Sequence, residues 1–518
     1  MQLRFHRAPA LGRLWLLSVG LAVGILPVIS AESEAHTFHH ENVLGTSLKL
    51  HVDSPSLFTD RKAEATVLGE IDRLSGILSS YSETSEFSAF LNGPEATRKV
   101  SRELIEVLSA CDHWKAVSGG AFNPAAELLG RLWVTSARQD RLPSESELAE
   151  AVRLVRAQAW EIDASAGTVT RRGGVPLTLN AIAKGYIIDR ACRAAMAESA
   201  EISGLLLDIG GDLRVWGKAA RSIGIADPSS PADNAPPLCR IMLRDAAVAT
   251  SGNYARGFEI DGVHYSHIID PRSGRPVDEV TSATVIAPEA AQADVLATIL
   301  NVLAPEEGIR LVDRLKSTEC LIVTQDGNTL RSSGWERYSD PVQHPALLTG
   351  FAAPEEAPEE GSEEPAWGND SQFVVELQFS RTQRFRYNRP YVAVWIEDAE
   401  GKAVRTLCLW VGDLQWLWDL RRWSSHHGRD GKFVQAVSRA TRPPGRYSLL
   451  WDGRANGGKF APAGKYSVCI EAVREHGGYG LIRQPVEIGK GPFALDMRGN
   501  YEIRRASVKC EKKKAPST

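Results

Sequence analysis

An aspartate and a threonine four residues apart, Asp294 and Thr298, could together bind a metal ion. They lie in a stretch with the pattern of a helix, where positions i and i+4 share one face. A carboxylate and a hydroxyl on one face can bind the same cation, and oxygen ligands favour a hard ion such as Mg²⁺ over zinc. Such a pair alone is more often ordinary helix surface, so the prediction depends on what surrounds it.

A strand-to-helix junction at residues 177–189, LTLNAIAKGYIID, is a second candidate. Backbone amides at the start of a helix attract phosphate, and Lys184 in the first turn would add a full positive charge. An ordinary junction with a solvated lysine explains the same residues.

Four turn segments accompany these two features: GGAFNPAAELLGRLW (119–133), LLDIGGDL (206–213), VATSGNYAR (248–256) and HYSHIIDPRSGRP (264–276). The glycine pair in the second segment would let the backbone pass close to a ligand. Each segment is individually compatible with plain turn chemistry. Their order along the chain is more informative than any one of them.

All of these candidate residues lie in a first block of helices and strands, about residues 36–345. Apolar periodicity predicts helices over 61–81, 101–119 and 183–199, and a buried strand that breaks into a glycine turn over 204–217. This alternation indicates an α+β or mixed α/β domain. Residues 346–370 follow as a linker, because six glutamates and three prolines lie between Pro354 and Pro365.

The second block, residues 371–505, consists of short β-rich runs separated by glycine, proline, asparagine and aspartate. This spacing predicts an antiparallel sandwich of the immunoglobulin-like kind. Tryptophans are dense here, and they are either core residues or an exposed aromatic binding face. Residues 506–518 are predicted to form a basic tail.

Composition and the N-terminus limit the function classes. A formal net charge of −4 argues against a nucleic-acid partner. Three arginines before the apolar run Leu14–Ile29, with small residues at Ser30 and Ala31, predict a signal peptide over residues 1–31 and hence export; a membrane anchor is the alternative. The seven cysteines show no zinc motif or disulfide framework, although a Cys408–Cys469 bridge would suit an exported protein.

Taken in order, eight motifs of the first block resemble the ApbE-type FAD:protein FMN transferases over about residues 38–340. They are VLGTSLKL (43–50), LSSYSETSEFSAFLN (78–92), LNAIAKGYIID of the junction (179–189), the four turn segments above, and ADVLATIL (293–300). The resemblance implies an α+β flavin-transferase domain with T-fold-like halves that faces the periplasm. It implies an activity that cuts FAD and attaches FMN, through its phosphate, to a threonine or serine of a target protein.

The same resemblance implies roles for individual residues. Asp294, Thr298 and the carbonyl of Ala181 would bind Mg²⁺, while His267 would act as the base and Lys184 would stabilise charge on the phosphates. The expected FAD-binding residues are Leu44, Tyr81, Ala121, Phe122, Asn123, Thr178, Lys184, His267 and Ile268. Tyr81 and Phe122 would supply aromatic walls for the isoalloxazine ring.

The sequence departs from the family at three of these positions. Leu44 replaces a usual methionine, Asn123 replaces a frequent aspartate, and Thr178 stands where an aspartate precedes the lysine motif. Two carboxylates near the flavin site are therefore neutral here, so a role that needs negative charge at those positions is lost.

Three functions are compatible with these observations. The first is Mg²⁺-dependent transfer of FMN from FAD to a protein acceptor, with release of AMP. The second is an FAD pyrophosphatase that uses water and yields FMN and AMP, and the third is a flavin-binding or envelope scaffold without turnover. No flavinylation acceptor motif is evident in this chain, so the acceptor would be another protein.

The segment 451–472 resembles flagellar hook-cap-like β domains and predicts a docking role for the second block.

Overall fold

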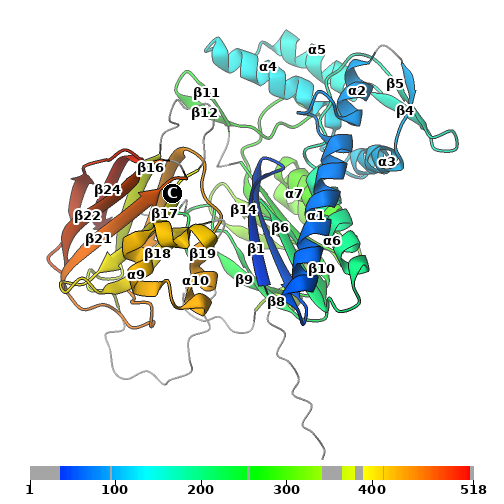
Figure 1. The fold of residues 1–518 in the computed structure, drawn as a ribbon. Coiled ribbons are helices and arrows are strands. Elements are labelled where there is room, and N and C mark those ends of the chain that lie inside the picture. Colours follow the sequence, from blue (N-terminus) through cyan, green and yellow to red (C-terminus); the bar gives the residue numbers. More distant parts are fainter. Residues whose placement is uncertain are drawn as a thin grey trace, which may run out of the picture.

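The computed structural model describes residues 36–93, 96–230, 232–253, 257–340, 364–379, 389–411, 414–475 and 477–513. The predicted signal peptide and residues 346–363 of the predicted linker lie outside these ranges. An eight-stranded sheet organises the first half of the chain, in the order β1-β2-β6-β7-β10-β13-β14-β15 (Figure 1). All neighbouring strands in it are antiparallel. Its strands are β1 His36–Val43, β2 Thr46–Asp53, β6 Gly204–Ile209, β7 Asp212–Gly217, β10 Ala246–Gly252, β13 Val280–Ala287, β14 Glu319–Thr324 and β15 Thr329–Arg331.

Helices α1 (Leu57–Leu78), α6 (Ala183–Glu198), α7 (Ala290–Val302) and α8 (Pro305–Val312) pack with this sheet. Figure 1 shows α1, α6 and α7 side by side along one face. Residues of β2 and β6 alternate: Leu48, Leu50, Leu205 and Leu207 are buried against the helices, as the two-residue period of a strand requires. The helices predicted over 61–81, 101–119 and 183–199 are confirmed as α1, α3 (Arg102–Val117) and α6.

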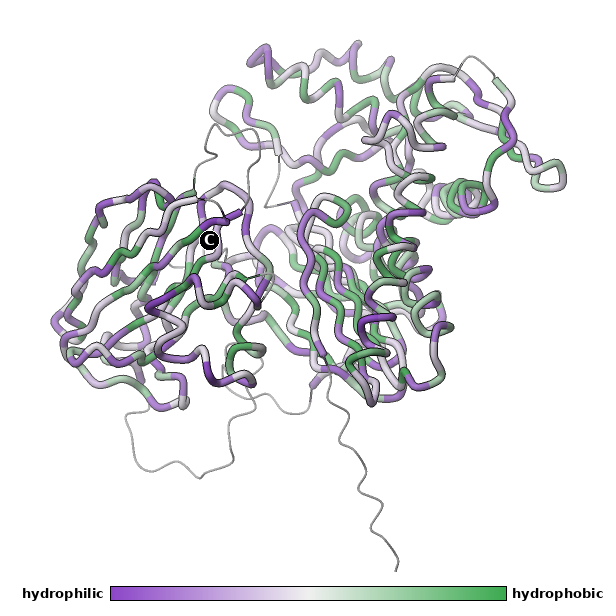
Figure 2. Tube along the Cα trace, in the orientation of Figure 1, coloured by the Kyte–Doolittle hydropathy of each residue, from purple (hydrophilic) through white to green (hydrophobic). Residues whose placement is uncertain are grey.

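A smaller helical layer lies beyond one end of the sheet (Figure 1). Along its helices α4 and α5, hydrophilic and hydrophobic residues alternate, as Figure 2 shows, which is typical of helices with one buried face. Its elements are α2 Glu86–Asn92, α3, η1 Pro124–Ala126, α4 Glu127–Arg138 and α5 Glu145–Arg156, with the small sheet of β3 Thr97–Lys99, β4 Trp160–Asp163 and β5 Thr168–Arg171. Two hairpins complete this half: β8 Arg221–Ile225 with β9 Cys239–Leu243, and β11 Gly257–Ile260 with β12 Val263–Ser266. The 3-10 helix η2 covers Trp335–Tyr338.

The second half is mostly β structure, in two sheets of four and five strands. Both sheets contribute to one core: Val375 of β16 and Val508 of β24 come from the first, and Val394 of β17 and Ile470 of β21 come from the second. The four-stranded sheet has the order β20 Gly445–Trp451, β16 Ser371–Phe379, β24 Ile503–Lys512, β23 Phe493–Met497. The five-stranded sheet has the order β19 Ser438–Arg439, β18 Ala403–Trp410, β17 Tyr391–Glu397, β21 Gly464–Val473, β22 Tyr479–Ile488.

A helical insertion between β18 and β19 is the main feature of this half that sequence patterns did not predict. It comprises η3 (Leu414–Asp419), α9 (Arg421–His427) and α10 (Gly431–Val437) and packs on the five-stranded sheet through a second core. Most of the predicted aromatic positions are core residues, since Trp395, Trp410, Trp423 and Trp451 are buried. Trp418 is the exception, with 58% of its surface exposed.

Two expectations about the second half are corrected. Residues 506–512, expected in a basic tail, belong to strand β24, where Ala506, Val508 and Cys510 point into the core. The exposed lysines alternate with these residues, and this alternation makes the segment a strand rather than a tail.

All seven cysteines are free, so the Cys408–Cys469 bridge is absent. No helix within the described residues is long and apolar enough to cross a membrane.

Candidate active site

Helices α6 and α7 meet where the two predicted chemical features lie. The backbone N–H of Gly185 donates to Oδ2 of Asp294 across 3.1 Å, so the strand–helix junction and the Asp294 helix form one site. A Cβ at Gly185 would lie 2.3 Å from the carbonyl oxygen of Ala290 on α7, so glycine allows the two helices to approach this closely. Lys184 therefore lies near Asp294, and the charge of Asp294 helps to raise the pKa of this lysine.

A second carboxylate, Asp212 at the start of β7, completes this cluster. Its Oδ2 lies 2.6 Å from Nζ of Lys184. Burial raises the pKa of both acids, and the neighbouring charge of Asp212 moves the pKa of Asp294 further upward. Burial alone would lower the pKa of Lys184, but the charges of Asp212 and Asp294 outweigh burial and raise it. The cluster is thus two buried acids held together by one cation.

The sequence analysis singled out the glycine pair of LLDIGGDL but gave no role to the two aspartates of this segment. Asp208 and Asp212 flank Gly210 and Gly211. Oδ1 of Asp208 accepts a 2.9 Å hydrogen bond from the N–H of Gly211, which fixes the turn, and Asp212 then faces Lys184. Two acids on either side of a tight glycine turn after a buried strand are a signal that could have been used.

The donor set of this cluster fits a hard cation. Two buried carboxylates repel each other, and Lys184 supplies one balancing charge, so a divalent ion would be favoured there. Thr298 lies one turn from Asp294 on α7, and Ala181 lies just ahead of α6. Among the described residues, no group of three or more His, Cys, Asp or Glu side chains could hold a metal, so hydroxyl and carbonyl oxygens would have to complete the coordination.

Residues 267–272 form a corner that follows strand β12 and is hydrogen-bonded to helix α7. His267 is exposed and Ile268 is half-buried. The N–H of Ile268 donates to Oγ of Ser266 across 3.0 Å, and Nη2 of Arg272 donates to the carbonyl of Val302 across 3.3 Å. Val302 ends the helix that carries Asp294, so one helix positions both the acid and the corner.

Tyr81 and Thr178 lie together at a separate cavity of about 340 Å³. The side-chain amide of Asn180 donates to the hydroxyl of Tyr81 across 2.7 Å, and the N–H of Asn180 donates to Oγ1 of Thr178 across 3.3 Å. Tyr81 is 82% exposed, so one face of its ring is open. That these two residues bind FAD stays a prediction.

Ala121, Phe122 and Asn123 are buried and do not belong to the lining of that cavity. Oδ1 of Asn123 accepts from the N–H of Ala125 across 3.0 Å, and its Nδ2 donates to the carbonyl of Val155 across 2.8 Å. Because a carboxylate could not make the second bond, asparagine at this position has a structural role of its own.

Leu44 occupies the turn between β1 and β2 and borders another hollow, next to α1. Its φ of 49° is left-handed and is followed by Gly45 at 79°, a two-residue hairpin turn in which leucine is rare. The neighbouring Thr46 packs against Gly210, where a Cβ would lie 2.6 Å from the threonine side chain. The Leu44 motif therefore contacts the turn that positions Asp212. Tyr254 of the SGNY segment lies outside the described residues.

Comparison with known proteins identifies the family that each half of the chain matches. A family model described as the ApbE family matches residues 44–322, and one described as a predicted periplasmic protein (DUF2271) matches residues 372–505. The FAD:protein FMN transferase of Treponema pallidum is 32% identical over 256 residues, covering 45% of this chain and 69% of that protein. The ApbE protein of Thermotoga maritima aligns with a TM-score of 0.54 at 30% identity, covering 59% of this chain and all of that structure. The flavin transferase ApbE of Vibrio cholerae, solved as a variant, gives 0.52 at 26% identity with 59% and 100% coverage. The chain belongs to the ApbE family, and its second half matches the DUF2271 family.

Proposed function

We propose that this protein is a Mg²⁺-dependent FAD:protein FMN transferase, which attaches FMN to a threonine or serine of a target protein and releases AMP. The observation that carries the proposal is the cluster at the start of α6, where Asp212 pairs with Lys184 and Asp294 accepts from the N–H of Gly185. Cleavage of a pyrophosphate requires positive charge near its oxygens, and this cluster combines a lysine, a helix start and a cation site. Relatives named FAD:protein FMN transferases support it.

Each of the candidate site residues would have its own role in this reaction. Asp294, Thr298 and the carbonyl of Ala181 would hold Mg²⁺, which supplies charge neutralisation on the phosphates. Lys184 would bind the same phosphates, and His267 would take the proton of the attacking hydroxyl. The hydroxyl oxygen forms a bond to the phosphorus of the FMN half, while the bond from that phosphorus to the bridging oxygen breaks and AMP leaves. Tyr81 would contact the ring system.

FAD hydrolysis is the alternative favoured by one observation. His267 is exposed, so a water molecule has access to the proposed base as readily as an acceptor hydroxyl does. Water at that position would give free FMN and AMP. The assay below separates the two reactions.

The experiment combines mature protein, FAD, Mg²⁺ and a target protein that carries an Asp-Gly-x-Ser/Thr-Gly/Ala-x-Thr sequence. Free AMP is measured by chromatography, and covalent flavin is measured by fluorescence of the denatured acceptor. Equal amounts of AMP and covalent flavin are expected. AMP without covalent flavin would instead establish hydrolysis, and tight FAD binding with neither product would leave only a flavin-binding role.

The setting of the enzyme is also part of the proposal. The signal-peptide pattern of residues 1–31 and the match of residues 372–505 to a family described as predicted periplasmic favour an exported, periplasmic protein. We assign residues 36–345 to the flavin-transferase domain and residues 371–505 to an immunoglobulin-like sandwich. The second half would dock a partner or an envelope component.

A further inference from the structure

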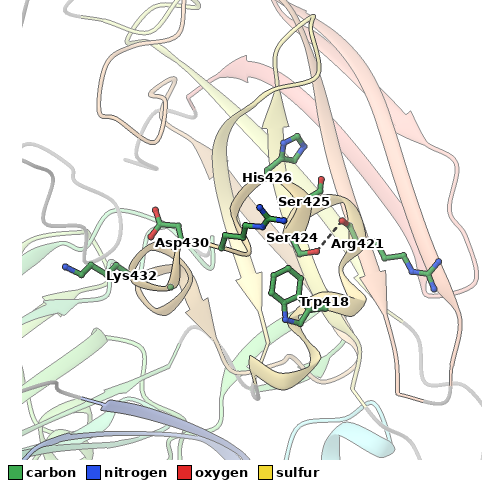
Figure 3. A pocket seen from close by; sticks show the side chains of 9 residues that line it. Trp418, Arg421, Ser424, Ser425, His426, Asp430 and Lys432 are labelled. Atoms are coloured by element: carbon green, nitrogen blue, oxygen red, sulfur yellow. Dashed lines mark hydrogen bonds between the residues drawn. The ribbon is translucent and has the colours of Figure 1, made fainter.

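The outer side of the helical insertion, residues 414–437, carries a hollow of about 1110 Å³ that the proposed flavin chemistry does not use. Figure 3 shows Trp418 between Arg421 on one side and Lys432 on the other, with Ser424 and Ser425 on the helix between them. Because the other described tryptophans of the insertion and sheets are largely buried, an indole that is 58% exposed is unusual in this half.

The inner side of the same insertion is held rigidly on the sheet. The carboxylate of Glu471 accepts from the N–H groups of Arg422 and Trp423, each across 2.9 Å. Glu397, with no exposed side-chain surface, accepts from Nε and from Nη2 of Arg422, each across 2.7 Å. Two buried acids thus fasten α9 to the sheet, and the hollow on its outer side is a preorganised surface.

Charges on the outer side are arranged differently. Arg421, Arg429 and Lys432 line the hollow. Within the described part of the chain, none of these three has a carboxylate within ion-pair distance, and Arg421 instead lies over the ring of Tyr479, 5.1 Å from its centroid. The acid of the hollow, Asp430, accepts from the N–H of Phe433 across 3.0 Å and so caps α10. The hollow is therefore cationic.

Trp418 is positioned by contact rather than by chance exposure. A Cβ at Gly428, the residue that ends α9, would lie 2.9 Å from the Cζ3 atom of the indole. Glycine there lets the helix end press against one edge of the ring and leaves the rest of the ring open. Exposed tryptophan and arginine on a rigid support are typical of the residues that dominate protein–protein binding energies.

We infer that this hollow docks an acidic segment of a partner protein, whose carboxylates meet Arg421, Arg429 and Lys432 while a ring or aliphatic side chain covers Trp418. Charge complementarity selects an acidic partner. Three cations on a chain with a net charge of −4 are few for a nucleic acid, which needs a long basic surface.

The test measures anisotropy of a short fluorescent peptide with glutamates on both sides of a tyrosine, added to the full-length protein. Saturable binding that weakens with salt is expected. Trp418→Ala and the double change Arg421→Ala with Arg429→Ala should each weaken it about tenfold or more. Arg446→Ala and Leu495→Ala, which alter exposed residues of strands β20 and β23 in the four-stranded sheet, should bind as the wild type does.

Three results would overturn the inference. They are the absence of saturable binding, equal affinity for a peptide with glutamine in place of every glutamate, and wild-type affinity in Trp418→Ala. Co-sedimentation with vesicles of anionic phospholipid that is lost in Trp418→Ala, without peptide binding, would assign the hollow to a membrane surface instead. None of these measurements depends on FAD, so they stand apart from the test of the transferase proposal.

Discussion

Asp294 is a buried acid whose pKa is raised well above its usual value, by burial and then by Asp212. An acid with a higher pKa in the folded than in the unfolded state reduces stability as pH rises above the unfolded value, about 4. Without a divalent cation, the protein should therefore become less stable from about pH 4 toward the raised pKa of Asp294. Thermal unfolding in chelator at several pH values measures this effect.

Mg²⁺ should reverse this loss of stability, because it binds the folded state only. In Asp294→Asn, both the loss with rising pH and the stabilisation by Mg²⁺ should become much smaller. Equal stabilisation of wild type and variant by Mg²⁺ would contradict the placement of the cation at Asp294.

The substitution Asn123→Asp introduces the aspartate that is frequent in the family at this position. Asn123→Asp removes the donor to the carbonyl of Val155 and buries a charge, so it should lower the free energy of unfolding by about 1–3 kcal/mol. Denaturation in urea measures the change. Asn180→Asp, at an exposed position, is the control and should change stability by less than about 0.5 kcal/mol. A stable Asn123→Asp with higher activity would show that the position serves the flavin site instead.

The residues of the cluster differed in how far sequence could predict them. Lys184 and Asp294 became candidates because each stands in a motif that resembles the ApbE family, whereas the helix pattern around each is weak evidence on its own. Asp212 was not, because its partner Lys184 is distant in sequence and only the sheet order brings β7 beside α6. Asn123 was expected at the ligand, but its two hydrogen bonds to backbone place it in the core, and no sequence pattern shows those bonds.

At the scale of elements, the site depends on how closely α6 approaches α7. Gly185→Ala would place a Cβ 2.3 Å from the backbone of Ala290, so the helices must separate. Stability should fall by about 1–3 kcal/mol, and transfer should fall further because the Gly185 contact to Asp294 is lost. Gly130→Ala on α4, where nothing lies within 4 Å of the added Cβ, is the control and should be neutral or slightly stabilising. Wild-type transfer by Gly185→Ala would show that the close approach is not needed.

Sequence periodicity predicted the long helices and the glycine turn between β6 and β7, because one apolar face or a run of apolar residues defines each of them. It did not predict η3, α9 and α10, because they are short and because α9 begins at a buried carboxylate of a distant strand, Glu471. It also assigned residues 506–512 of β24 to a tail, because Lys509 and Lys512 hid the alternation of its buried residues.

At the scale of the whole molecule, the two halves are joined by polar contacts on both sides of the first block. Asn234, in the loop between β8 and β9, accepts from the N–H of Leu450 across 2.7 Å and donates to its carbonyl across 2.8 Å. Arg389 donates to Asn42, just ahead of the Leu44 turn, across 2.5 Å, and Glu41 accepts from the hydroxyl of Thr441. Strand β20 is an edge strand, and this loop covers its free edge.

Asn234→Ala should therefore loosen the second half from the first. Amide hydrogen exchange of Leu450 should become faster by about tenfold, because its N–H loses its partner. Asn328→Ala, in an exposed turn, should leave that exchange rate unchanged. Unaltered exchange at Leu450 in Asn234→Ala would show that the loop does not hold the halves together.

Whether Mg²⁺ held by Asp294 drives FMN transfer can be measured with wild type and Asp294→Asn across a Mg²⁺ titration, read as the intact mass of the acceptor protein. The acceptor should gain the mass of FMN less one water with the wild type, and the rate should depend saturably on Mg²⁺. Asp294→Asn should transfer at least about a hundredfold more slowly at the same Mg²⁺ concentration. Transfer by Asp294→Asn at the wild-type rate, or transfer by the wild type in chelator, would show that a cation at Asp294 is not needed.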